Sequence, residues 1–358
     1  MTVALAPDDV VRSRADVAAG AREPLLVLEP LREFLAAAGL DAPVDLTVAP
    51  IGEGHSNVTF VLSTGIVLRR PPRGPLPPSA HDVLREARLL NALTDTSVPV
   101  PRVLATCDDP GVIGAPFFVM ERIDGEVITD RLPGALDSDG QRTAIAVDLV
   151  DTLAALHAVD WAALGLEGFG RPTGYLERQL RRFSGLWEHN RTRPIDALDE
   201  VAAWLAANLP QSPPATIVHG DYRLGNTIYA AAAPARLVAV LDWEMATIGD
   251  PLADVGYLMV HWVQTGDPPS RFTVGTVTSE PGFPSRGELL ERYERRSGRH
   301  VANLDWYVVL ALWKAAVFME GNYRRAVEGA TDDPFLKSFG EGVVELAERA
   351  QQVTRHGF

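Results

Sequence analysis

The chain contains very little cysteine: Cys107 is the only one among 358 residues. One cysteine cannot form an intramolecular disulfide bond, and no group of Cys and His residues has the spacing of a zinc site. No His or Asn motif accompanies Cys107, so a buried hydrophobic role is favoured over a nucleophilic one. We therefore expect a cytoplasmic protein without a structural metal.

Positive charge is also scarce. The chain has 33 Lys and Arg residues against 47 Asp and Glu residues, a formal net charge of -14. Proteins that neutralise nucleic-acid phosphates need a surplus of basic residues on some face, so we expect no nucleic-acid partner. An acidic surface could favour a cationic substrate such as an amino sugar or choline, although acidity is also ordinary among soluble proteins.

Long apolar runs are missing as well. The longest one, Val308 to Met319, is interrupted by Lys314 and is too short to span a bilayer. The first residues, Met1 to Asp9, lack the basic region and the apolar run of a secretion signal. We therefore expect no membrane partner.

The residues that are present suit a globular protein. With 46% hydrophobic and 22% charged residues, the chain is long enough for two lobes that each have a core. We predict an N-terminal arm at residues 1–28, an N-terminal lobe at 29–122 and a C-terminal lobe at 123–358. Hydrophobic periodicity predicts both helices and strands, and residues 264–287 are predicted to form a long loop. The predicted helices are 28–40, 81–93, 141–159, 287–297, 305–329 and 334–353, and the predicted strands are 46–51, 57–62, 65–70 and 117–123.

The most informative stretch runs from Ile217 to Asn226 and is followed by Asp242, sixteen positions after the asparagine. Residues 227–229 and 236–241 have the pattern of two strands across an Ala/Pro turn. Position 234 is the midpoint of 226 and 242, so an antiparallel pairing would place Asn226 and Asp242 opposite each other, roughly 5 Å apart. An amide oxygen and a carboxylate, together with nucleotide phosphates, suit Mg²⁺. Asp221 lies on the preceding loop, where a base could meet an incoming hydroxyl group.

At these residues the chain resembles the aminoglycoside phosphotransferase and choline kinase branch of the protein-kinase-like superfamily. The shared pattern is His219-x-Asp221-x-x-x-x-Asn226 followed by Asp242, with Gly249-Asp250-Pro251-Leu252-Ala253-Asp254 as the next expected segment. Three further segments resemble phosphotransferase-like domains that occur alone in actinobacteria or fused to acyl-CoA dehydrogenases in animals. They are Val67 to Pro72, Pro99 to Val103 and Pro281 to Arg286. The resemblance covers about residues 45 to 330.

This resemblance implies a bilobal, protein-kinase-like α+β fold, with a small β-rich N-terminal lobe and a larger, mainly helical C-terminal lobe. It also implies a kinase that uses ATP, or GTP, with Mg²⁺ bound by Asn226 and Asp242. Asp221 would accept the hydroxyl proton, and Arg223 would neutralise charge on the transferred phosphoryl group. His219 is expected to brace the loop backbone, with a general-base role as the alternative.

Two residues outside this motif have expected supporting roles. Asp254 would accept hydrogen bonds from the backbone of the catalytic loop, on a helix capped by Asp250 and started by Pro251. His157 lies on the apolar face of the 141–159 helix and is expected to be a hydrogen-bonded core histidine.

The N-terminal lobe carries the predicted nucleotide contacts. In the kinase fold a cation at the end of the third strand clamps phosphates and a helical glutamate orients it, and Arg69 and Glu86 occupy those places. The cation is arginine where the superfamily has lysine. Arg70 is an alternative clamp, because strand alternation lets only one of the two arginines point inward. A surface ion pair between Arg69 and Glu86 is the simpler interpretation.

Backbone groups supply the other expected contacts. Glycines between the first two strands would let backbone amides approach phosphate, although a plain turn would look the same. Main-chain groups near the end of the 117–123 strand would bind the purine edge. The complete set of predicted nucleotide-binding residues is Gly52, Gly54, Ser56, Asn57, Arg69, Glu86, Glu121 and Ile123.

Three functions remain open at this stage. A small-molecule kinase agrees with the whole motif, and its acceptor would be a small hydroxyl compound such as an aminoglycoside, choline, a sugar or a hydroxyacyl metabolite. A nucleotide-binding pseudokinase would explain the missing lysine, but the intact Asp221, Asn226 and Asp242 oppose it. A protein kinase would need an Ala-Pro-Glu sequence and an activation segment, which are absent. Monomer and homodimer are both open.

Overall fold

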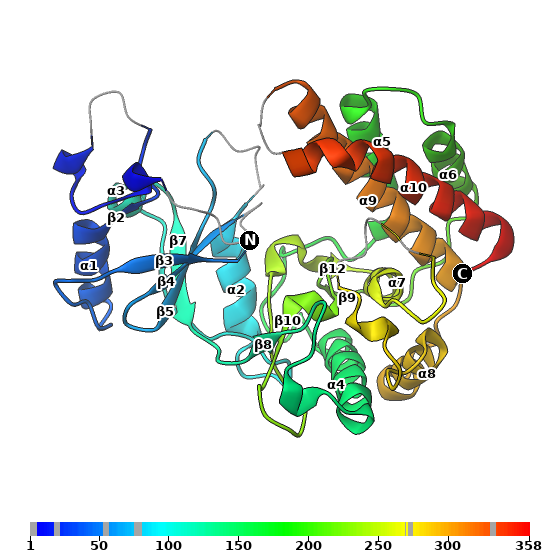
Figure 1. Ribbon diagram of the computed structural model, residues 1–358, viewed down its shortest axis with the longest axis horizontal. Coiled ribbons are helices and arrows are strands. Elements are labelled where there is room, and N and C mark those ends of the chain that lie inside the picture. The colour runs from blue at the N-terminus through cyan, green and yellow to red at the C-terminus, as the bar shows by residue number, and fades with distance from the viewer. Residues whose placement is uncertain are drawn as a thin grey trace. The chain divides into compact units, whose positions relative to one another are not determined.

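The computed structural model describes residues 6–17, 22–52, 57–74, 81–268, 270, 275–329 and 334–358. The chain divides into two compact units, Met1–Asp124 (unit 1) and Gly125–Phe358 (unit 2). Unit 1, blue to cyan in Figure 1, contains a β-sheet, whereas unit 2, green to red, is mainly helical. The predicted α+β class, with a β-rich lobe and a helical lobe, is therefore confirmed.

Unit 1 is built on a five-stranded sheet whose neighbouring strands are all antiparallel. Four of the strands lie where alternating hydrophobicity predicts them, and the fifth, β6, has no counterpart in the sequence prediction. In spatial order the strands are β3 (Val48–Ile51), β4 (Val58–Leu62), β5 (Ile66–Arg70), β7 (Phe117–Glu121) and β6 (Val103–Cys107). Cys107 is buried, as predicted for a small hydrophobic residue.

Helices cover both faces of this sheet. On one face, Leu31 and Leu35 of α1 (Leu28–Ala37) are buried in an apolar cluster with Phe60 and Leu68. Successive strand residues point to opposite faces, so Arg69 points away from that cluster, toward α2 (Val83–Leu93). The remaining small elements of unit 1 are β1 (Val10–Val11), which pairs in parallel with β2 (Leu26–Val27), and α3 (Pro110–Ile113).

Unit 2 combines helices with two small antiparallel sheets. One sheet consists of β8 (Glu126–Val127), β10 (Thr227–Tyr229) and β11 (Leu237–Val240), and the other pairs β9 (Thr216–Val218) with β12 (Thr247–Gly249). Four of the helices match predicted ones. No helix was predicted at α5 or α6, and only the start of α7 was predicted. The helices are α4 (Asp139–Ala158), α5 (Tyr175–Asn190), α6 (Asp196–Ala207), α7 (Leu252–His261), α8 (Arg286–Ser297), α9 (Leu304–Val327) and α10 (Pro334–His356).

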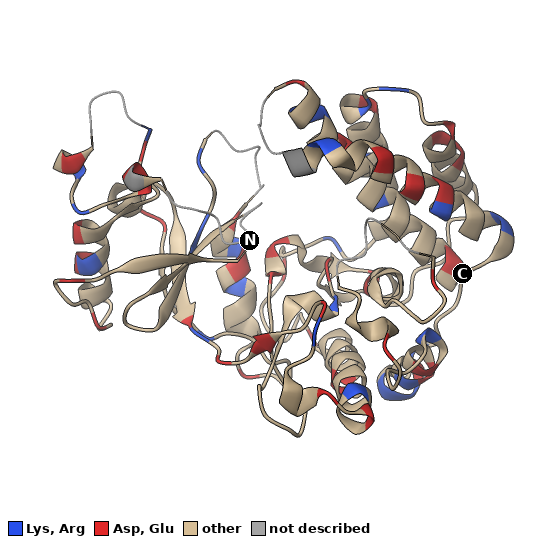
Figure 2. Ribbon diagram, in the orientation of Figure 1, with Lys and Arg blue, Asp and Glu red and all other residues tan. Residues whose placement is uncertain are grey.

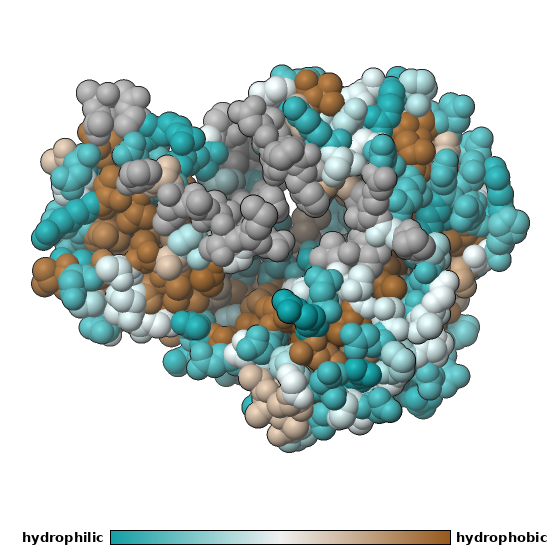
Figure 3. Space-filling view, viewed as in Figure 1, coloured by the Kyte–Doolittle hydropathy of each residue, from teal (hydrophilic) through white to brown (hydrophobic). Residues whose placement is uncertain are grey.

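The surface of unit 2 carries charges of both signs. Acidic and basic segments occur together along α8 and α10 (Figure 2). Hydrophilic side chains cover most of the visible face of α6 and α10 (Figure 3). Among the described residues, no helix has both the length and the apolar content needed to cross a membrane.

The packing of α7 against α9 leaves no room for a side chain at Gly256. A Cβ atom there would lie 2.6 Å from the backbone carbon of Tyr307 on α9. Backbone cannot yield as a flexible side chain does, so we expect Gly256→Ala to destabilise the protein by about 1–3 kcal/mol, the usual cost of overpacking. Thermal and urea unfolding of the purified protein would measure this change.

Gly185 on α5 provides the matched control, because a Cβ there would meet no atom within 4 Å. Gly185→Ala should stabilise the protein by about 0.5–1 kcal/mol, since alanine is the better helix former. Similar stability changes in the two variants would contradict the close approach of α7 and α9.

Candidate active site

The predicted catalytic loop joins β9 to β10 in unit 2 and ends in a 3-10 turn at Leu224–Asn226. Gly220 in this loop has a φ of 87°, a conformation that is costly for residues with a Cβ atom. A Cβ atom there would also lie 2.9 Å from Cβ of Met245. The loop therefore requires glycine at position 220 for steric reasons alone.

A buried carboxylate holds the start of this loop. Asp254 of α7 is fully buried and accepts hydrogen bonds from the backbone N–H groups of His219, at 2.7 Å, and Gly220, at 2.8 Å. This confirms the supporting role predicted for Asp254. A buried carboxylate is tolerated when hydrogen bonds compensate for its lost hydration, so these contacts tie the loop to α7.

His157 of α4 extends this network. Its Nε2 atom lies 3.3 Å from Oδ2 of Asp254, and its Nδ1 atom lies 2.7 Å from the hydroxyl group of Tyr293. The side chain is buried, as predicted for a core histidine. Its contact with Asp254 could not be read from the sequence, because 97 positions separate the two residues.

His219 braces the loop with both ring nitrogens. The backbone N–H of Asp221 donates to its Nδ1 atom at 3.2 Å, which leaves Nε2 to donate to the carbonyl oxygen of Leu241 at 2.9 Å. The ring is fully buried. The geometry therefore favours the bracing role over the general-base alternative.

Asp221 is oriented by two neighbours. Nδ2 of Asn226 donates to its Oδ2 atom at 2.7 Å and to its backbone oxygen at 2.8 Å. Nε of Arg223 lies 3.5 Å from Oδ1. The Asp221 side chain is 24% exposed as a whole, whereas its Oδ1 atom is buried.

The same hydrogen bonds decide which way the Asn226 amide points. Because Nδ2 serves Asp221, the Oδ1 atom is the free end, and it accepts no hydrogen bond from the residues that the structure describes. Amide oxygens are suitable ligands for hard cations such as Mg²⁺. The donor set therefore fits the predicted metal-binding role.

Asp242 follows β11, as the hairpin prediction requires, but the pairing of β10 with β11 is shifted by one residue from the predicted register. The prediction places Asn226 opposite Asp242, whereas Thr227 pairs with Val240 and the N–H of Leu241 donates to the Asn226 carbonyl oxygen at 2.8 Å. Asp242 adopts φ 62° and ψ 62°, a left-handed conformation that ends the strand. Non-glycine residues rarely take this conformation, and it is concentrated at functional sites.

In unit 1, Arg69 and not Arg70 contacts α2. Nε of Arg69 lies 2.9 Å from Oε2 of the buried Glu86, and its Nη1 atom donates to Oγ1 of Thr59 at 3.3 Å. Arg70 is buried on the opposite face, and burial lowers its pKa to about 10. Its guanidinium group donates to the carbonyl oxygens of Leu25, Pro71 and Ile113. The geometry therefore favours Arg69 as the cation that glutamate orients.

We expect Arg69→Ala to weaken nucleotide binding, since it removes the proposed phosphate clamp. Glu86→Ala should reproduce part of this loss, and the two effects should add incompletely in the double variant because the residues share one task. Arg69→Lys should retain partial activity if a positive charge suffices. Titration calorimetry would measure the nucleotide affinity of all four variants, and steady-state kinetics would measure the activity of Arg69→Lys.

Arg70→Ala is the matched control. It should lower the free energy of unfolding, because three carbonyl groups lose their donor, and leave nucleotide affinity nearly unchanged. The opposite result, weaker nucleotide binding for Arg70→Ala and none for Arg69→Ala, would assign the clamp to Arg70.

The structure describes only some of the other predicted nucleotide-binding residues. Gly52 has a φ of 83°, as a turn between strands requires, whereas Gly54 and Ser56 lie outside the described residues. Asn57 is buried, and its side-chain oxygen lies 3.2 Å from Nδ1 of His81.

The expected purine-binding segment follows β7. The N–H of Glu121 donates to the carbonyl oxygen of Arg102 at 2.9 Å, so that donor is already used within the sheet. The backbone of Ile123 makes no hydrogen bond to the described part of the chain. Main-chain recognition at this segment would therefore depend on Ile123 more than on the amide of Glu121.

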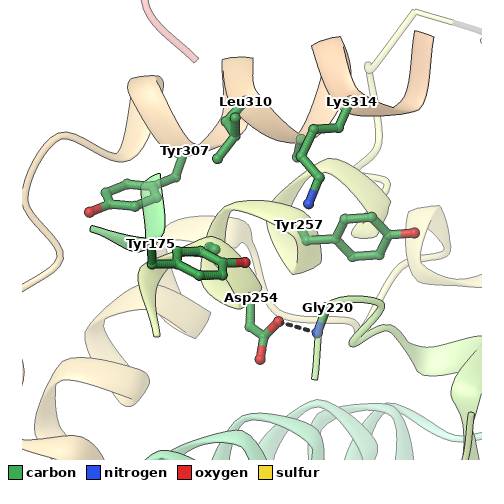
Figure 4. Close-up of a pocket in the computed structure, with 9 residues that line it drawn as sticks. Tyr175, Gly220, Asp254, Tyr257, Tyr307, Leu310 and Lys314 are labelled. Atoms are coloured by element: carbon green, nitrogen blue, oxygen red, sulfur yellow. Dashed lines mark hydrogen bonds between the residues drawn. The ribbon is translucent and has the colours of Figure 1, made fainter. Parts of the chain in front are cut away.

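A small pocket adjoins the catalytic loop within unit 2 (Figure 4). The Gly220 backbone and Asp254 form one side of it, and Lys314 of α9 extends toward them from the other. Burial, followed by the charge of Asp221 and a hydrogen bond to it, raises the pKa of Tyr257 well above its usual value. The remaining lining residues are Tyr175, Ala253, Tyr307, Leu310 and Ala311.

Sequence reasoning did not select Tyr257 or Lys314 as site residues. Tyr257 stands three positions after Asp254, a spacing that places both on one face of a helix and could have singled it out. Lys314 had a signal as well, since it is the charge that interrupts the longest apolar run. The helices that pack near Lys314, α5 and α7, are distant from it in the sequence.

Among the described residues, no cluster of three or more His, Cys, Asp and Glu side chains could hold a metal ion. The expected site is of another kind, since Asn226 and Asp242 would bind Mg²⁺ together with nucleotide phosphates.

Residues 47–307 match the model of the phosphotransferase enzyme family. The chain belongs to this family. The rat protein named acyl-CoA dehydrogenase family member 11 is 34% identical over 357 residues, which are 97% of this chain and 45% of that protein. The chain therefore spans less than half the length of this curated relative.

One solved structure supports the same family, and a second supports the fold. A putative aminoglycoside phosphotransferase from Ralstonia eutropha is 32% identical, with a TM-score of 0.78, covering 90% of this chain and 97% of that one. The GDP complex of aminoglycoside 2'-phosphotransferase-IIIa is 15% identical, with a TM-score of 0.60, covering 91% of this chain and 99% of that one. The second match shows the kinase-like fold alone.

Proposed function

We propose that this phosphotransferase is a small-molecule kinase that transfers the γ-phosphoryl group of ATP or GTP to a hydroxyl group. The observation that carries this proposal is the orientation of Asp221 by Asn226 and Arg223 on a loop anchored by Asp254. A carboxylate held this way, on a side chain that is partly exposed, is suited to accept a proton from a hydroxyl group. We also propose a cytoplasmic location, on the basis of the single cysteine.

In this proposal the catalytic loop carries out a phosphoryl transfer. The acceptor oxygen forms a bond to the γ-phosphorus while the bond between that phosphorus and the oxygen bridging to the β-phosphate breaks. The hydroxyl proton passes to Asp221, and the nucleoside diphosphate leaves. Arg223 offsets the negative charge that gathers on the transferred phosphoryl oxygens.

Oδ1 of Asn226 and the carboxylate of Asp242 would hold Mg²⁺. A bound divalent cation neutralises phosphate charge and helps to position the transferred group. The Nδ2 atom of Asn226 donates to Asp221, which leaves the amide oxygen available for this purpose.

The two units divide the work in this proposal. Unit 1 would bind the nucleotide through Arg69, oriented by Glu86, and through the turn that contains Gly52. Unit 2 would supply the phosphoryl-transfer residues and the acceptor site.

A nucleotide-consumption assay with ATP and GTP tests this function across a panel of acceptors. The panel includes aminoglycosides, choline, sugars and hydroxyacyl compounds, the last because curated relatives carry an acyl-CoA dehydrogenase name. Acceptor-dependent release of nucleoside diphosphate, with a phosphorylated product seen by mass spectrometry, is the expected result. Tight nucleotide binding without turnover for any acceptor would favour a pseudokinase module instead.

A further inference from the structure

Tyr257 of α7 lies beside the catalytic loop. It stands one turn beyond Asp254, whose Oδ1 atom accepts a hydrogen bond from the backbone N–H of Gly220 at 2.8 Å, so both side chains lie on the same face of α7. Tyr257 and Gly220 also line the same pocket (Figure 4). Because Asp221 is the next residue of the loop, the fold brings the phenol ring of Tyr257 close to the proposed base.

The ring of Tyr257 is held by its own helix. It stacks on the ring of His261, with the two centres 4.2 Å apart and an angle of 27° between the planes. Nδ1 of His261 lies 2.9 Å from the backbone oxygen of Tyr257, which fixes the second ring in turn. Burial lowers the pKa of His261, so the imidazole is neutral at neutral pH. The stack therefore holds the phenol hydroxyl group in one place.

Asp221 has one carboxylate oxygen that lacks a comparable partner. Its Oδ2 atom accepts a hydrogen bond from Nδ2 of Asn226 at 2.7 Å. Its Oδ1 atom is buried and accepts no hydrogen bond from a backbone N–H, amide or guanidinium group of the described residues. Nε of Arg223 lies 3.5 Å from Oδ1, which is longer than an ordinary hydrogen bond. A buried carboxylate oxygen without a donor is unfavourable, because nothing replaces its lost hydration.

The hydroxyl group of Tyr257 is suited to supply the missing donor. It donates to no other residue in the part of the chain that the structure describes. Burial, followed by the charge of Asp221 and a hydrogen bond to it, keeps the pKa of Tyr257 well above its usual value, so the hydroxyl retains its proton at neutral pH. The charges of Arg223 and Asp242 act on the same hydroxyl, which places it near the other residues proposed for phosphoryl transfer.

We propose that Tyr257 is a positioning residue that donates a hydrogen bond to Oδ1 of Asp221 and thereby fixes the plane of the base. This inference rests on the proposed kinase function. A carboxylate held at one oxygen can still turn about its Cβ–Cγ bond, whereas donors on both oxygens prevent this rotation. A carboxylate has about four acceptor positions, so Tyr257 and Asn226 leave room for the acceptor hydroxyl. Oδ2 then takes the proton while Oδ1 stays anchored.

Tyr257→Phe tests this role, because it removes the hydroxyl group and keeps the ring that stacks on His261. With an acceptor identified by nucleotide consumption, kcat should fall about tenfold or more, as expected for the loss of one hydrogen bond to a charged group. The KM for nucleotide should stay within about twofold of the wild-type value. An unchanged kcat would overturn the inference.

Tyr229→Phe is the matched control. It also removes a buried hydroxyl group, one that donates to the carbonyl oxygen of Ile145 at 2.7 Å. It should lower the midpoint of thermal unfolding and leave kcat within about twofold of wild type. An equal loss of kcat in both variants would show that a buried hydroxyl matters for stability alone, and would also overturn the inference.

A double variant separates positioning from a structural role. Once Asp221→Asn has removed the base, the further loss of the Tyr257 hydroxyl should lower the residual turnover by less than about twofold, because the two residues share one task. A full multiplication of the two single effects would show that Tyr257 acts independently of Asp221.

A spectroscopic measurement distinguishes this inference from the kinase proposal, because it needs no turnover. The whole chain is labelled with ¹³C at the Cζ atom of tyrosine, and Tyr257→Phe and Tyr229→Phe assign the two resonances. Asp221→Asn should shift the Cζ resonance of Tyr257, since an amide oxygen is a weaker acceptor than a carboxylate, and should leave that of Tyr229 in place. A Tyr257 resonance that does not move would overturn the contact. A shift without turnover for any acceptor would uphold the contact and reject the kinase function.

Discussion

Replacing Asp221 by asparagine should lower kcat by about a hundredfold or more, while folding and nucleotide affinity change little. Asparagine has the same size, and its amide oxygen can still accept the hydrogen bond from Asn226. The side chain can no longer take a proton from the acceptor hydroxyl group. Steady-state kinetics, nucleotide titration and thermal unfolding of the same preparation would measure the three quantities.

Asp41→Asn, an exposed change of the same chemistry in unit 1, controls for the lost charge. It should leave kcat as in wild type. Near-normal turnover in Asp221→Asn would place the base elsewhere, whereas a large loss of stability would show that the carboxylate mainly supports the loop.

Asp242→Ala should abolish the Mg²⁺ dependence of nucleotide binding, because a bound cation needs the carboxylate. Asp242→Asn is the sharper companion variant. Asparagine tolerates the left-handed backbone that Asp242 adopts, so it removes the charge while keeping the conformation. Alanine loses both and should also unfold more easily. Titration calorimetry with and without Mg²⁺ would separate the two effects.

If both variants bound nucleotide with Mg²⁺ as tightly as wild type, the metal assignment of Asp242 would be wrong. If only the alanine variant lost binding, the backbone conformation at this position would be what matters, and not the charge.

The catalytic motif and most strands could be predicted from the sequence, because both depend on residues that are close together in the chain. Alternating hydrophobicity is a property of each strand, and the motif residues His219, Asp221 and Asn226 lie within 23 positions of Asp242. The hairpin register was missed for a geometric reason. The backbone N–H of Ala230 donates to the carbonyl oxygen of Arg236, so the turn is centred one residue before the predicted position. A bulge in the β10–β11 pairing corrects this shift only in part.

The choice between Arg69 and Arg70 could not come from sequence. Strand alternation states that the two arginines face opposite sides, but it does not say which side α2 covers. Only the packing of Glu86 against Arg69 resolves this. By contrast, α5 does carry a helical signal that was overlooked, because the apolar residues Leu176, Leu180, Phe183 and Trp187 recur at helical spacing.

The anchoring of the catalytic loop by Asp254 also has an evolutionary consequence. Asp254 lies two residues before Gly256, at the close contact of α7 with Tyr307, and the Tyr307 hydroxyl group donates to Asp250 at the start of the same helix. Substitutions that shift α7 would therefore displace the proposed base along with the helix. We therefore expect the contact between α7 and Tyr307 to tolerate fewer substitutions than parts of the chain that touch neither α7 nor the catalytic loop.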